Sequence, residues 1–192
     1  DSTFRAFIST KFDTDKNDTL SDAEIAKVKN ITCTGKQVES IKGVEYFTAL
    51  TWLDMSRNKL TELDVSHNTL LATIQCPYNK IKKLDLSNNP KVTRIYCQNN
   101  QIDDVNIAPC TGLLYLVLNY NNPSIDVKGK TALKTIDLSH NALSSIDLAD
   151  NTRLNELRLL YNNFTALDVS KLTALKTLAC GNNRLTNLDL TK

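Results

Sequence analysis

The sequence predicts a leucine-rich repeat solenoid, an α/β fold in which short parallel strands stack into a right-handed horseshoe. Two observations predict it: a fixed motif and a fixed period. The cleanest motif has the spacing L-x-x-L-x-L-x-x-N-x-L and consists of Leu133, Ile136, Leu138, Asn141 and Leu143. The same spacing begins again at Leu50, Leu71, Val92, Leu113, Leu154 and Leu175. Because the starts are 20 or 21 residues apart, one continuous solenoid is favoured over separate globular domains.

Each repeat is expected to form one coil with a strand, a turn at the asparagine and a return segment. A weaker copy opens at Val28, so the solenoid is expected to span residues 28–192 in about eight coils. The strands would form a parallel sheet on the concave face. The turn asparagines are expected to bond the backbone of their own coil and the next, as a buried ladder. They are Asn58, Asn79, Asn100, Asn121, Asn141, Asn162 and Asn183.

A second column of polar residues recurs on the return segments. It comprises Asp64, Asp85, Asn106, Asp126, Asp147, Asp168 and Asp189. Stacked carboxylates repel one another unless each accepts hydrogen bonds, and the following Val or Leu and then Ser suits a capped turn. We therefore expect turn capping here, with a row of cation sites as the alternative.

The first 30 residues lack the repeat and predict a helical N-terminal cap. Phe4, Phe7, Ile8 and Phe12 fall at helical spacing on one face. This face is expected to cover the first coil of the solenoid.

Residues 13–24 match an EF-hand calcium loop at every position but the sixth. Calcium prefers six to eight oxygen ligands, which alternate residues of such a loop provide. The expected metal ligands are Asp13, Asp15, Asn17, Thr19, Ser21 and Glu24. Asp18 replaces the usual glycine, and aspartate tolerates a left-handed backbone better than most residues. The alternative interpretation is a plain capping box, in which Ser21 and Glu24 open a short helix; both can hold at once.

The five cysteines are predicted to be mostly buried. Four of them occupy the third apolar position of the strand: Cys33, Cys76, Cys97 and Cys180. Only Cys76 and Cys97 lie on adjacent strands, whose spacing of about 4.8 Å exceeds the usual separation of disulfide β-carbons. Free thiols are therefore expected, and Cys110, placed in a turn, is expected to be the reactive one.

Residues between the apolar strand positions point to the opposite, concave face. Five of the six tyrosines and the single tryptophan lie there or just beyond the strands. Exposed aromatics with arginine are typical of binding hot spots. The expected ligand face comprises Trp52, Tyr78, Arg94, Tyr96, Tyr115, Val117, Tyr120, Arg158 and Tyr161. The alternative is that aromatic and β-branched residues merely suit strands.

Composition argues against several other functions. The 23 basic and 21 acidic residues are balanced and form no basic stripe, which disfavours nucleic acid and anionic membranes as partners. No apolar run is long enough for a membrane span. An enzyme is disfavoured because the two histidines, His67 and His140, lie beside turns without a converging nucleophile and acid, and no phosphate-binding loop or zinc spacing occurs.

The repeats resemble those of bacterial surface leucine-rich repeat proteins of the internalin-like type. The resemblance rests on the phrase from Ile41 to Ser56, on the recurring Leu-Asp-Val-Ser, and on Phe-Asp-Thr-Asp-Lys-Asn-Asp in an EF-hand-like cap. It implies an extracellular or cell-surface protein that binds a host or neighbouring protein through its concave face. A carbohydrate or glycan ligand is the alternative. An uncovered last coil is expected either to continue or to form an end-to-end homodimer.

Overall fold

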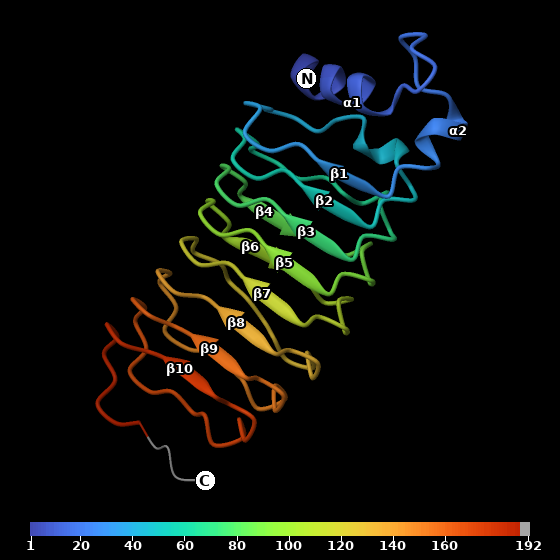
Figure 1. Ribbon diagram of the computed structural model, residues 1–192. Coiled ribbons are helices and arrows are strands. Elements are labelled where there is room, and N and C mark those ends of the chain that lie inside the picture. The colour runs from blue at the N-terminus through green and yellow to red at the C-terminus, as the bar shows by residue number, and fades with distance from the viewer. Residues whose placement is uncertain (189–192) are drawn as a thin grey trace.

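A computed structural model describes residues 1–188 and confirms the predicted solenoid (Figure 1). Two helices, α1 (Ser2–Phe12) and α2 (Asp22–Ile25), precede the coils, and one 3-10 turn covers Val44–Tyr46. The strands are β1 (Asn30–Thr32), β2 (Trp52–Asp54), β3 (Thr73–Gln75), β4 (Lys83–Asp85), β5 (Arg94–Tyr96), β6 (Asp104–Asn106), β7 (Tyr115–Val117), β8 (Thr135–Asp137), β9 (Glu156–Arg158) and β10 (Thr177–Ala179).

Eight strands form one parallel sheet in the order β1-β2-β3-β5-β7-β8-β9-β10. The register never slips: Leu53 of β2 lies opposite Ile31 of β1 and Ile74 of β3, and the same slot repeats to β10. Equivalent positions of successive repeats therefore lie side by side along one wall, which we call the sheet face. The return side carries a separate parallel pair, β4 and β6, which the repeat motif alone does not predict.

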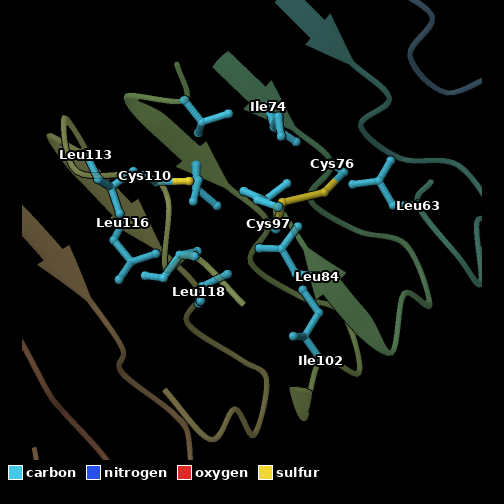
Figure 2. Packing of buried hydrophobic residues seen from close by; sticks show 14 of the residues in the cluster. Leu63, Ile74, Cys76, Leu84, Cys97, Ile102, Cys110, Leu113, Leu116 and Leu118 are labelled. Atoms are coloured by element: carbon cyan, nitrogen blue, oxygen red, sulfur yellow. A yellow bond between two sulfur atoms is a disulfide. The ribbon is translucent and has the colours of Figure 1, made fainter. Parts of the chain in front are cut away.

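The core is the column of apolar residues between the sheet and the return segments (Figure 2). The central residues of the strands and those of the return segments, such as Leu53, Ile74, Leu84 and Ile102, are completely buried. Each coil offers two apolar rows that only its neighbours can cover, so burial extends through the stack.

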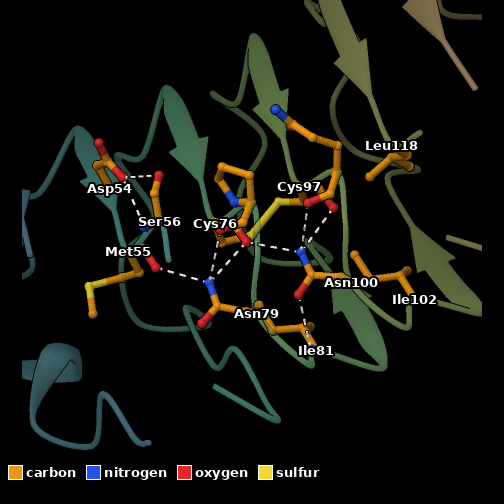
Figure 3. The surroundings of a disulfide bond; sticks show 12 residues. Asp54, Met55, Ser56, Cys76, Asn79, Ile81, Cys97, Asn100, Ile102 and Leu118 are labelled. Carbon is orange, nitrogen blue, oxygen red and sulfur yellow. Dashed lines mark hydrogen bonds between the residues drawn. A yellow bond between two sulfur atoms is a disulfide. The ribbon is translucent and has the colours of Figure 1, made fainter. Parts of the chain in front are cut away.

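The predicted asparagine ladder is present in the turns (Figure 3). Asn79 shows the pattern: its Oδ1 accepts from the backbone N–H of Leu60, and its Nδ2 donates to the carbonyls of Met55 and Cys76 at 2.9 and 3.0 Å. Asn100 repeats the same bonds to Ile81, Cys76 and Cys97 one coil later. These side chains join adjacent coils because each donates to one carbonyl of its own turn and one of the preceding turn.

A second buried ladder runs on the return side and was not predicted. Asn68 donates to the carbonyls of Val44 and Phe47, and Asn89 and Asn151 make equivalent bonds in their own coils. Three coils replace the asparagine, with Cys110, Lys130 and the buried Leu172. Cys110 directs its thiol at the carbonyl of Asn89, and the buried Lys130 donates from Nζ to the carbonyl of Ala108. The sequence signal was an asparagine four residues after three aspartates of the column, Asp64, Asp85 and Asp147.

The aspartate column caps turns, as the sequence predicted. Asp64, Asp85, Asn106, Asp126, Asp147 and Asp168 each accept the backbone N–H of the residue two positions later. These backbone bonds hold the pKa values of Asp64, Asp85 and Asp168 below the usual range. Asp189 lies outside the described residues.

The structure corrects both cysteine predictions. Cys76 and Cys97 form a disulfide between β3 and β5 (Figure 3), because their Cα atoms are 4.8 Å apart, within the range that a disulfide spans. The expectation of free thiols was wrong for this pair, since it treated the ideal strand spacing as the distance between β-carbons, and it holds for Cys33, Cys110 and Cys180. Cys110 is completely buried, and burial raises the pKa of its thiol to about 11. It is therefore not a reactive thiol.

The N-terminal residues pack on the first coils as their spacing predicted. Phe4 and Ile8 of α1 are buried, and Phe12 contacts the ring of Phe47 with centroids 6.2 Å apart. Asp1 caps α1 by accepting from the backbone of Phe4. The first apolar row of the solenoid is thereby covered by helix rather than by another coil.

Candidate functional site: the sheet face and its aromatic rim

The sheet face presents every second strand residue to solvent. The alternate strand positions are buried, whereas Trp52, Arg94, Tyr96, Tyr115 and Val117 are half-buried side by side. Arg158, Tyr78, Tyr120 and Tyr161 are exposed. All nine predicted ligand residues thus lie at least partly accessible on one wall of the solenoid.

The structure brings four of these nine together at the centre of the wall. Arg94 and Tyr96 of β5 pair in register with Tyr115 and Val117 of β7, and the Arg94 guanidinium lies 5.5 Å from the centre of the Tyr115 ring. This cluster combines two phenol rings with one cation.

Two predicted residues lie away from that cluster. Trp52 is separated from Arg94 by one strand, on which the buried Thr73 occupies the equivalent position. Arg158 forms an ion pair with Glu156 of its own strand at 2.6 Å. Because this pair is exposed, it is a weak interaction that a ligand could exchange.

The three remaining tyrosines belong to a rim column that borders the sheet face. The rim column consists of the residues with a left-handed backbone that lie three positions after the strands β2, β3, β5, β7, β8, β9 and β10. Their φ values are between 54 and 58°, and they are Arg57, Tyr78, Asn99, Tyr120, His140, Tyr161 and Asn182. Asparagine tolerates this conformation, but large side chains rarely adopt it. Tyr78, Tyr120 and Tyr161 are nevertheless 47, 48 and 51% exposed.

Rim side chains of neighbouring coils stack face to face. The His140 ring lies between Tyr120 and Tyr161, with centroids 4.1 and 4.3 Å away and interplanar angles of 10 and 16°. At the other end, the Arg57 guanidinium lies over Tyr78, 4.6 Å from the ring centre. Sequence reasoning omitted Arg57 and His140 from the site, although the 21-residue period places both in the same column as the tyrosines.

At the sixth position of the predicted calcium loop the backbone is left-handed, the conformation that glycine usually supplies there. Asp18, in place of glycine, adopts φ 65°. Oxygen atoms of Asp13, Asp15 and Glu24 lie within 4.8 Å of one another. Asn17 instead accepts from Thr19 and donates to Asp15. Three carboxylates therefore converge, as a hard cation requires.

Glu24 also performs the capping role that the alternative interpretation gave it. Ser21 and Glu24 form a complete capping box at the start of α2. Both Glu24 oxygens accept two hydrogen bonds each, from Thr14 and from Ser21. These bonds, led by that of the Thr14 hydroxyl, lower the pKa of Glu24 to about 2. Bidentate coordination of calcium would require the two hydroxyls to turn away.

The histidines have structural partners. His140 lies in the rim stack, and His67 Nδ1 lies 3.2 Å from the Ser66 hydroxyl. That hydroxyl bonds Asp64 at 2.7 Å, so serine bridges the acid and the histidine. A nucleophile needs the histidine between serine and acid, which this order does not provide.

Comparisons with known proteins agree with this architecture. No protein-family profile matches the chain. Internalin J of Listeria monocytogenes serotype 4b (strain F2365) is 31% identical over 69 residues, which is 36% of this chain and 8% of that protein. The functional domain of internalin J, described as including a cysteine ladder, superposes with a TM-score of 0.80 at 28% identity, covering 99% of this chain and 47% of that one. The chain is a leucine-rich repeat protein that is similar to Listeria internalins.

A second solved structure supports the fold. Internalin C2 of the same strain superposes with a TM-score of 0.80 at 18% identity, covering 98% of this chain and 87% of that one. The chain spans less than half the length of the internalin J chains that it matches. Within residues 1–188, no helix is long and apolar enough to cross a membrane.

Proposed function

We propose that this protein is a non-enzymatic recognition module that binds a protein partner through the sheet face, at the surface of a bacterium or secreted from it. The observation that carries the proposal is the cluster of Arg94, Tyr96, Tyr115 and Val117 with the exposed rim tyrosines beside it. A soluble monomer rarely presents so many large aromatic side chains on one wall. Likeness to internalins supports an adhesion or interaction role.

The cluster at the centre of the sheet face has the residue types that contribute most binding energy in protein interfaces. Tyrosine and arginine dominate binding energy because they offer large rigid area together with a hydrogen-bonding group. The scaffold beneath them is fixed by buried residues at every other strand position, so little ordering is needed on binding. Trp52 and Arg158 would lie at the edges of the same footprint.

The test compares the wild type with the double variant Tyr96→Ala, Tyr115→Ala. Both proteins are immobilised and incubated with extracts of candidate host or neighbouring cells, and proteins retained only by the wild type are identified and titrated. We expect the double variant to bind the identified protein roughly a hundredfold more weakly. Lys171→Ala, an exposed change on the return side, is the control. Equal binding by the double variant would refute the sheet face as the site.

A carbohydrate ligand is the second candidate for the same wall. Exposed aromatic faces beside Asp54, Asp137 and Arg158 also suit sugars. A glycan array separates the two: specific retention of one glycan by the wild type, lost in the Tyr96→Ala, Tyr115→Ala variant, would favour carbohydrate over protein.

Calcium binding at the N-terminal loop is proposed as a supporting function. The proposed ligands are Asp13, Asp15, Asn17, Thr19, Ser21 and Glu24, and the convergence of the three carboxylates carries the proposal. A single loop of this kind suggests a dissociation constant of about 0.1 to 1 mM. Calorimetry of the chelated protein should show saturable heat and a raised Tm. The Asp15→Asn variant should show neither, and an unchanged Tm at 5 mM calcium, roughly five times that constant, would contradict the site.

A further inference from the structure

The rim column contains one ring-sized gap. Going along the coils, Arg57 covers Tyr78, Asn99 follows, and Tyr120, His140 and Tyr161 then stack without interruption. Asn99 has the same left-handed φ, 56°, as its neighbours, so its side chain starts from the equivalent point of the column. It carries an amide where the next coils carry rings.

Each ring beside the gap has an aromatic or cationic partner on the side away from the gap and, within residues 1–188, none on the side toward it. One face of Tyr78 is covered by Arg57 from the preceding coil, and one face of Tyr120 is covered by His140 from the following coil. The opposite faces therefore look toward the Asn99 coil from its two sides. The Asn99 side chain makes no hydrogen bond to residues 1–188, which leaves its amide available at the floor of the gap.

The neighbouring part of the column shows what fits such a space. Tyr78 and Tyr120 are two coils apart, as are Tyr120 and Tyr161, so each pair is separated by roughly 9.6 Å along the sheet. Between Tyr120 and Tyr161 the space is filled by His140, a flat aromatic ring. The space above Asn99 therefore has the width of one flat aromatic ring.

The charged residues of the rim column and those two positions after it are positive at the two coils that precede the gap, and the nearest acids of the gap's own coil are Asp103 and Asp104, four and five residues after Asn99. Arg57, Lys59 and Lys80 lie in or directly beside the rim at the two preceding coils, and none of them forms an ion pair within residues 1–188. The rim residues themselves include no carboxylate. This disfavours a guest cation such as a guanidinium and favours a guest flanked by acids.

We propose that the gap between Tyr78 and Tyr120 is a pocket for one aromatic side chain of a partner protein, taken from a segment whose neighbouring residues are acidic. The ring would stack between the two phenols above Asn99, and the carboxylates would face Arg57 and the two lysines. This inference rests on the proposed protein-binding function and names the chemistry of one contact.

The first experiment uses short peptides in place of the whole partner. Acetyl-Glu-Phe-Glu-amide is titrated into the protein and followed by NMR, and its ring protons should move upfield because they lie over two aromatic faces. Acetyl-Glu-Ala-Glu-amide and acetyl-Lys-Phe-Lys-amide should each bind roughly tenfold more weakly. Equal affinity for the three peptides would overturn the proposal.

The second experiment fills the gap. Asn99→His adds the ring that His140 supplies two coils later and should abolish the upfield shifts while leaving the Tm unchanged within a few degrees. Asn182→His places the same ring at the far end of the column, with the same φ of 56°, and should leave peptide binding intact. Binding retained by Asn99→His, or lost equally in both variants, would refute the pocket.

These results are distinguishable from failure of the proposed function. The Tyr96→Ala, Tyr115→Ala variant keeps the rim and should bind the peptide normally. If the whole partner binds that double variant as tightly as the wild type but loses affinity for Asn99→His, the central cluster is wrong and the rim pocket stands. If the peptide fails to bind the wild type, the pocket is wrong whatever the central cluster does.

Discussion

Removing one rung of the turn ladder should destabilise the protein severely, and Asn79→Ala is the sharpest case. The Asn79 side chain is 9% exposed and makes three close hydrogen bonds, with Leu60, Met55 and Cys76. Alanine leaves one N–H and two carbonyls of the backbone without that partner. At about 1 to 1.5 kcal/mol for each group, the free energy of unfolding should fall by about 4 kcal/mol.

Urea unfolding followed by the fluorescence of Trp52 measures this loss, because Trp52 lies on β2, one strand from the coil of Asn79. Asn119→Ala is the matched control, since the Asn119 side chain makes no hydrogen bond within residues 1–188. It should change stability by less than about 0.5 kcal/mol. A difference below 1 kcal/mol between the two variants would show that the ladder is not a main source of stability.

Three further predictions concern acid, thiols and the disulfide. The lowered pKa of Glu24 means that its charge stabilises the fold above pH 4.5, and this contribution should disappear as the pH falls toward 2. In the Glu24→Gln variant, the fall of Tm between pH 4.5 and 2 should be smaller than in the wild type. Ellman's reagent should modify Cys180 first in the native protein, because Cys33 and Cys110 are buried, and should count three thiols, not five, after unfolding without reductant. Reducing the Cys76–Cys97 bond, which closes a separation of 21 residues, should lower the free energy of unfolding by about 3 kcal/mol, measured in urea with and without reductant.

The repeat was predictable because its causes are local and periodic. Apolar residues at fixed offsets, such as Leu50, Leu53 and Met55, define a strand whose partner must be the next coil, so register followed from counting. The aspartate turns were predictable for the same reason. The second ladder was missed because Cys110 and Lys130 interrupt its pattern and conceal the period of Asn68, Asn89 and Asn151.

The contents of the site were predictable, but its arrangement was not. Strand alternation places Tyr96 and Tyr115 on one face without any knowledge of coordinates. The stack around His140 depends on side-chain torsions and on a left-handed backbone, which no spacing rule shows. The disulfide likewise depends on the distance between two β-carbons, which the ideal spacing of strands does not determine.

Neighbouring residues in one turn show how the fold separates stability from recognition. Asn79 is buried and bonds three backbone groups, so it cannot vary without loss of the coil. Tyr78, directly before it, has a left-handed backbone and a side chain that lies under the Arg57 guanidinium and is 47% exposed. A tyrosine in the left-handed region costs about 1 kcal/mol, and one exposed cation–π contact returns at most a similar amount. The backbone strain therefore offsets the cation–π contact, and the exposed half of the ring is available for contacts outside the chain.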